Sequence, residues 1–149
     1  MANFFKSVPI QFLHTAKGCS EQDIFNLESV LQKKIAMSLR EYLLIFGKYQ
    51  TIFKEWDWHG CEGILKIQSL VDELITVWES QGIDMKLQKQ IVPFFNFQDT
   101  IFYVPFDLSD DPAVYSLDIG DEPTVKKRND HFSDFIEDWM QQTLLDKFW

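Results

Sequence analysis

The chain has 149 residues, with 23 Asp and Glu against 14 Lys and Arg, and therefore a formal net charge of −9 at pH 7. This length fits one domain with one core of ordinary size, so we expect a single domain over residues 1–149. No apolar run is long enough to span a bilayer, and two cysteines are too few for a disulfide scaffold. We therefore expect a cytoplasmic protein without a membrane partner, and the acidic balance argues against a nucleic-acid partner because phosphates are repelled.

The first predicted helix covers residues 20–28. Ser20 and Asp23 have the spacing of a reciprocal capping pair, in which each side chain accepts a hydrogen bond from the other residue's backbone N–H. Ile24 and Leu27 then lie on one helical face. This pattern predicts an amphipathic helix packed against a core.

A second amphipathic helix is predicted over residues 38–47. Ser38 and Glu41 again have the capping spacing, and Gly47 is expected to end the helix in a left-handed turn. The apolar face would consist of Leu39, Tyr42, Leu43 and Phe46.

The next part of the chain is predicted to hold two strands and a helix. The strands are expected within residues 48–68, around the segment that contains two tryptophans. The helix is expected to begin at a third capping pair, Ser69 with Asp72, and to end at Gly82.

Aromatic and β-branched runs follow, and they predict a three-stranded meander over residues 91–97, 100–108 and 113–119. Apolar residues occupy both faces of the second strand, so both faces are expected to be covered. A last helix is expected to open at Asp130. The pattern as a whole predicts an α+β fold, with an antiparallel sheet and helices packed mainly on one side.

Several of these segments resemble the SUKH superfamily, which includes bacterial immunity proteins and fungal regulators of cell-wall glucan synthesis. Residues 20–28 are similar to the family pattern S-x-x-x-I-x-x-x-E. Residues 40–44 (REYLL), 113–118 (AVYSLD) and 132–136 (FSDFI) are similar to its later motifs. The resemblance spans residues 20–145 and implies a SUKH-like fold and a protein that acts by binding another protein.

The acidic residues are concentrated in the second half of the chain. Residues 1–71 carry 8 Lys and Arg against 7 Asp and Glu, whereas residues 72–149 carry 6 against 16. A field of this sign attracts basic partners, although acidity also serves solubility alone. The candidate partner-binding acids are Asp107, Asp110, Asp111, Asp118, Asp121 and Glu122.

Two tryptophans, Trp56 and Trp58, are the other candidate partner-binding residues, because an indole supplies a large contact area at little entropic cost. The alternative is that they pack in the core. His59 and Cys61 follow closely, and on a strand they would share one face. A Cys–His nucleophile is then conceivable, but packing is the plainer interpretation, and the scattered His and Cys residues do not have the spacing of a zinc site.

The sequence contains none of the common catalytic or phosphate-binding motifs, so we expect neither an enzyme nor a cofactor. The resemblance then implies an immunity protein that neutralises a toxin, such as a nuclease, by occluding it. An acidic surface suits this role because nucleases present basic clefts. The alternative is a regulatory scaffold similar to the glucan-synthesis regulators.

Overall fold

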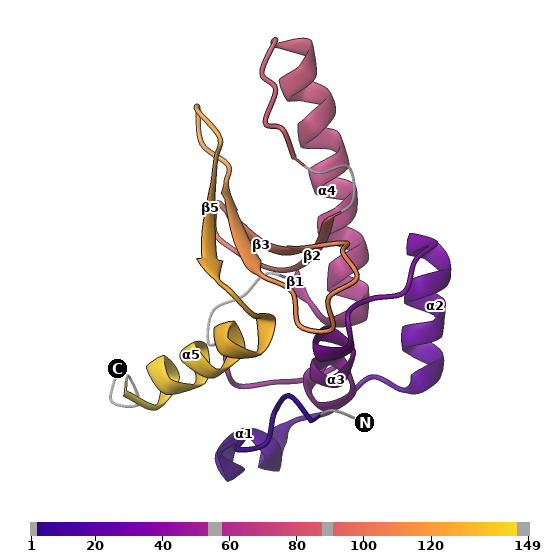
Figure 1. Cartoon of the computed structure of the whole chain (residues 1–149), viewed down its shortest axis with the longest axis vertical. Coiled ribbons are helices and arrows are strands. Elements are labelled where there is room, and N and C mark those ends of the chain that lie inside the picture. The colour runs from indigo at the N-terminus through magenta and orange to yellow at the C-terminus, as the bar shows by residue number, and fades with distance from the viewer. Residues whose placement is uncertain (1–2, 54–57, 88–90, 146–149) are drawn as a thin grey trace.

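The computed structural model describes residues 3–53, 58–87 and 91–145, and Figure 1 shows its helices around one sheet. The described elements, in chain order, are α1 (Ile10–Thr15), α2 (Glu21–Leu31), α3 (Met37–Phe46), β1 (Trp58–His59), α4 (Gly60–Ser80), β2 (Ile91–Phe97), β3 (Thr100–Pro105), β4 (Val114–Asp118), β5 (Thr124–Asn129) and α5 (Phe132–Leu145). The predicted α+β class is confirmed.

The five strands form one antiparallel meander in the order β1-β2-β3-β4-β5. Its middle strands confirm the prediction from the aromatic runs, and the register shifts beside Pro93, which has no N–H to donate to the ladder. The strand β5 was not expected. Five of its six residues are exposed, so it lacks the apolar alternation that identifies a strand in a sequence.

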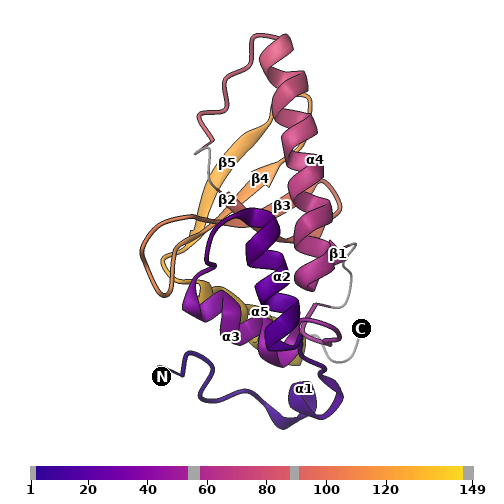
Figure 2. The same cartoon turned by 90° about the vertical axis from the view of Figure 1, so that its right-hand side faces the viewer.

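Alternate residues of β3 point into two different hydrophobic clusters. Phe102 and Val104 belong to the larger cluster, to which α1, α2, α3 and α5 contribute. Ile101 and Tyr103 belong to a smaller cluster formed with α4. Helix α4 covers one face of the sheet with its later turns, while Ile64 near its start joins the larger cluster on the other side. Helix α2 lies beside α4 (Figure 2). Both faces are covered, as the apolar character of this strand predicted.

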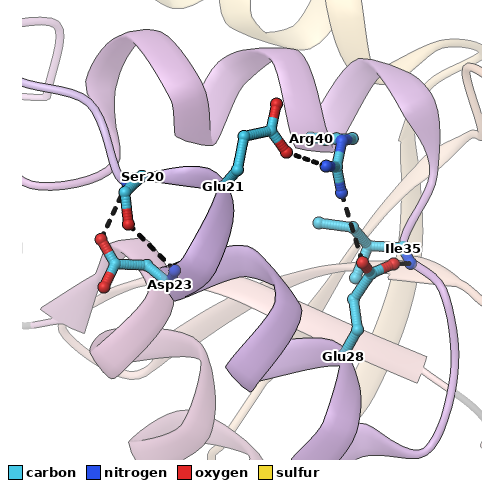
Figure 3. A network of polar contacts seen from close by, with 6 residues as sticks. All are labelled: Ser20, Glu21, Asp23, Glu28, Ile35 and Arg40. Carbon is cyan, nitrogen blue, oxygen red and sulfur yellow. Dashed lines mark hydrogen bonds and ion pairs between the residues drawn. The ribbon is translucent and has the colours of Figure 1, made fainter.

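Helices α2 and α3 are joined by a network of polar contacts, which Figure 3 shows. The Arg40 guanidinium pairs with the carboxylates of Glu21 and Glu28, and the Glu28 contact measures 3.2 Å. The other Glu28 oxygen accepts the backbone N–H of Ile35 at 2.9 Å, which fixes the loop between the helices. Because the two oxygens of Glu28 accept from two different groups, the contact between α2 and α3 has a defined geometry.

The predicted capping box at the start of α2 is confirmed, because Ser20 and Asp23 exchange hydrogen bonds of 2.8 and 3.0 Å (Figure 3). The corresponding prediction for α3 was wrong. Ser38 is completely buried one position inside this helix, where its backbone N–H donates to the carbonyl of Asp110. Glu41 accepts the backbone N–H of Phe4 instead of capping its own helix.

The predictions for the start of α4 were also wrong. Helix α4 begins at Gly60, so within the described part of residues 48–68 the only strand is the short β1. Ser69 and Asp72 lie inside the helix and cap nothing. The 21-residue helix ends near the expected position, with Gly82 in the left-handed region at φ 76°.

Three glycines meet where α3 ends, and we call Gly18, Gly47 and Gly60 the glycine junction. A Cβ on Gly60 would lie 1.9 Å from the Gly47 carbonyl oxygen, and one on Gly18 would lie 1.7 Å from the Leu44 carbonyl oxygen. Gly47 has φ −68°, so the expected left-handed turn is absent there. Glycine is required at this junction because backbone segments approach one another too closely for any side chain.

We expect Gly60→Ala to destabilise the fold by about 3–5 kcal/mol, because it adds a steric clash to the strain of a left-handed φ of 71°. Gly82→Ala is the matched control, since its φ is similarly positive but a Cβ there meets nothing within 4 Å. The control should cost about 1 kcal/mol. Urea unfolding measures both values, and equal losses would show that the close approach is not a constraint.

Candidate functional site

Of the two tryptophans proposed as partner anchors, only Trp58 is among the described residues. Trp56 lies outside the described residues. Trp58 is half-buried on the edge strand β1, where its backbone N–H donates to Asn96 Oδ1 at 3.0 Å. Its indole packs against the smaller hydrophobic cluster, beneath α4. Trp58 therefore contributes to packing, and its role as a partner anchor stays a prediction.

The six predicted acidic residues do not gather on one surface. Asp118 ends β4 beside the first residue of β3, and Asp121 and Glu122 follow in the next turn. Asp107, Asp110 and Asp111 lie in the β3–β4 loop, at the other end of the same strands. The two groups are separated by the length of β4, or about 17 Å for its five residues.

At the end of the sheet where β4 ends, Asp118 links the neighbouring strands β3 and β5. One oxygen accepts the hydroxyl of Thr100 at 2.8 Å, and the other accepts that of Thr124 at 3.5 Å. Three further acids are exposed in the neighbouring turns, and we call them the turn acids: Asp99, Asp121 and Glu122.

At the other end, the β3–β4 loop connects two helices. The carboxylate of Asp111 accepts the backbone N–H of Ser133 at 2.9 Å and its hydroxyl at 2.5 Å. It thereby caps the N-terminus of α5, where a negative charge is also favoured by the helix dipole. The carbonyl of Asp110 accepts the N–H of Ser38 in α3, while the Asp110 side chain is exposed.

The last helix adds acids that the sequence analysis did not single out. Asp134, Glu137 and Asp138 are exposed on α5, whose inner face carries buried Phe132, Phe135 and Ile136. Their i, i+3, i+4 spacing is a signal that would have placed them together on the outer face. Asp111 joins the loop to this helix, and we group the acids of both segments as the loop–α5 acidic surface, which we define as Asp107, Asp110, Asp111, Asp134, Glu137 and Asp138.

Glu137 lies close to three other carboxylates of this surface. Its pKa is raised, first by partial burial and then by the negative charges of Asp134, Asp138 and Asp111. Carboxylates from two segments far apart in the sequence therefore share one negative field. Beside them, Lys127 of β5 pairs with Asp130 at 2.7 Å.

The structure also contains a pocket of about 400 Å³ near the glycine junction. It is lined by Cys19, Lys48, Trp58, His59, Cys61 and Lys66, among others. The expectation that His59 and Cys61 share a strand was wrong, since one ends β1 and the other lies in the first turn of α4. Burial lowers the pKa of His59, which favours its neutral form.

Among the described residues, no three His, Cys, Asp or Glu side chains form a group that would hold a metal ion. In the same part of the chain, no helix is both long and apolar enough to cross a bilayer. The model of the SMI1 / KNR4 family (SUKH-1) matches residues 18–138 of the chain. Curated proteins offer no match.

We expect Asp111→Ala to lower the free energy of unfolding by about 1–2 kcal/mol, because it removes the cap of α5. Asp110→Ala should change it by less than about 0.5 kcal/mol, since only the backbone of this neighbour makes a structural contact. Urea unfolding compares the two. Equal effects would mean that Asp111 is as free as Asp110.

His131 and His59 should titrate in a defined order, with the higher pKa at His131. The pKa of His131 is raised above 6.5, mainly by its hydrogen bond to the Asp111 carbonyl, and burial lowers that of His59. His131 therefore stabilises the fold below pH 6.5 and loses that contribution as the pH rises. His59 costs stability as the pH falls below 6.5, because the unfolded chain takes up its proton first. An NMR titration assigned with His59→Gln and His131→Gln checks this order, and the reverse order would contradict it.

Proposed function

Since the chain belongs to the SMI1 / KNR4 family (SUKH-1), we propose that it is an immunity protein that binds a toxin domain through the loop–α5 acidic surface. The toxin domain would be basic, as nucleases are at their substrate clefts. The chain would act by covering that cleft and not by catalysis, in keeping with a family that is generally non-catalytic.

The convergence of carboxylates from the β3–β4 loop and α5 is the observation that carries this proposal. The raised pKa of Glu137, caused in part by three neighbouring acids, supports a concentrated negative field at this end of the sheet. Such a field raises the association rate with a basic partner and competes with phosphate for the same cleft.

The rigid packing of the elements that carry these acids also supports a role in binding a partner. The aromatic side chains of α5 pack in the larger cluster, with Phe135 5.5 Å from Phe94 and 5.2 Å from Phe102 between ring centroids. Asp111 ties the loop to the first turn of α5. The outer carboxylates are therefore held on rigid elements, which reduces the ordering cost of binding.

The test uses two variants that remove equal charge from opposite ends of the sheet. The first, Asp110→Asn with Asp134→Asn and Glu137→Gln, neutralises the loop–α5 acidic surface while sparing the cap residue Asp111. The matched control neutralises the turn acids, Asp99→Asn with Asp121→Asn and Glu122→Gln. The six side chains are exposed, so both variants should fold like the native chain.

The partner for this test would be a toxin domain encoded by a neighbouring gene, which the proposal predicts for an immunity protein. We expect the first variant to associate about tenfold more slowly at low salt in stopped-flow binding, with a flatter salt dependence. The control should change the rate by a factor of about 2 or less, and co-expression with the toxin should show the same order of protection.

Other outcomes would contradict parts of the proposal. Equal losses in both variants would mean that net charge acts, and not this surface. Unchanged rates in both would leave the acidity as a solubility device. Binding without loss of toxin activity would favour the alternative role, a regulatory scaffold.

A further inference from the structure

Two cysteines from distant parts of the sequence meet in the pocket beside the glycine junction. Cys19 directly precedes the capping residue of α2, and Cys61 is the second residue of α4. Both thiols are free and line the same pocket, and each is the largest influence on the pKa of the other. The proposed toxin-binding surface uses neither of them.

The position of Cys19 is fixed by its neighbours. Its backbone N–H donates to the Leu43 carbonyl at 2.8 Å, in the last turn of α3. Its Sγ occupies the space beside Gly47, where a Cβ would come within 2.4 Å of the sulfur. The glycine junction thus brings Cys19 to the N-terminus of α4, and the side chain has little freedom to move away.

The surroundings make the two thiols unequal. The pKa of Cys19 is lowered to about 7 by the Cys61 thiol and, to a smaller extent, by the Cys61 backbone N–H. That N–H lies in the first turn of a long helix, where backbone donors have no partner within the helix itself. Such a position favours a thiolate. The pKa of Cys61 is raised by the neighbouring Cys19 thiol and by burial, so Cys61 keeps its proton.

The pocket gives a small reagent access to this pair. Cys19 is only 6% exposed, but it and the half-buried Cys61 both line the cavity of about 400 Å³. Lys48 also lines it, and its charge favours the Cys19 thiolate, whereas Asp23, 3.5 Å from the ammonium, opposes it. A hydroperoxide is small enough to enter and reacts with thiolates.

We propose that Cys19 and Cys61 form a reversible oxidation site, in which hydrogen peroxide converts the dithiol to an intramolecular disulfide. The Cys19 thiolate attacks one peroxide oxygen, which gives Cys19 sulfenic acid and releases hydroxide. The Cys61 sulfur then attacks the Cys19 sulfur, the disulfide forms and water leaves with the Cys61 proton. A dithiol reductant restores both thiols by exchange.

The bond would cross-link the segment before α2 to the first turn of α4. Both segments already contact the end of α3, so the cross-link ties three helices together at the glycine junction. Closing so long a loop restricts the unfolded chain, and the oxidised protein should unfold at a higher temperature than the reduced one.

The test treats the purified chain with a modest excess of hydrogen peroxide under native conditions. We expect an intact mass lower by two hydrogen atoms, a 19–61 cross-linked peptide in a non-reducing digest, and full reversal by dithiothreitol. The melting temperature should rise by roughly 5–10 °C on oxidation. Two thiols still free after oxidation, or cross-links only between molecules, would overturn the proposal.

Matched single variants test the separate roles. In Cys61→Ala, Cys19 sulfenic acid has no partner, so dimedone should label Cys19. In Cys19→Ala, the contact with Cys19 is gone, but burial still raises the pKa of the Cys61 thiol, so labelling of Cys61 should be weaker than that of Cys19 in the other variant. The pH profile of iodoacetamide alkylation should have a midpoint near 7 in the native chain and a higher one in Cys61→Ala. Equal labelling of both variants would contradict the assigned roles.

Discussion

The close approach of backbones at the glycine junction is the constraint on which the rest of the structure depends. Gly60 lies so near the Gly47 carbonyl that there is no room for a side chain between the end of α3 and the start of α4. This contact fixes where α4 begins, and α4 in turn covers one face of the sheet. It also places Cys19 against the first turn of α4 and shapes the pocket between them. One point of contact therefore sets both the helix layer and the thiol site.

The residues that carry the family resemblance are largely structural in this chain. Ser20 caps α2, Ile24 is fully buried, and Glu28 binds both Arg40 and the loop before α3 (Figure 3). These contacts give Ser20, Ile24 and Glu28 structural roles in this chain. The exposed acids of the β3–β4 loop and α5 lie outside this motif, and their side chains are not needed for the same contacts.

Sequence reasoning worked where local patterns decide structure and failed where distant contacts do. The capping box at Ser20 and the apolar runs of β2 to β4 are local signals, and both were predicted correctly. The start of α4 was missed because glycine is a poor helix former, so Gly60 gives no local signal for a helix. Glycine is needed there because the Gly47 carbonyl, thirteen positions earlier in the sequence, lies too close for a side chain. Likewise, Ser38 and Glu41 have the spacing of a cap, but tertiary hydrogen bonds to Asp110 and Phe4 use them otherwise.

The candidate site shows the same division. Acids that are close in the sequence lie at opposite ends of the sheet because consecutive turns of a meander alternate between its two ends. The acids of α5, which are more distant in the sequence, complete the surface instead, through the contact of Asp111 with Ser133. Within this surface the Asp111 side chain stabilises the start of α5, whereas the side chains of Asp110, Asp134 and Glu137 are exposed. Such residues are free to change charge without disturbing the core, so one fold is able to present different surfaces to different partners.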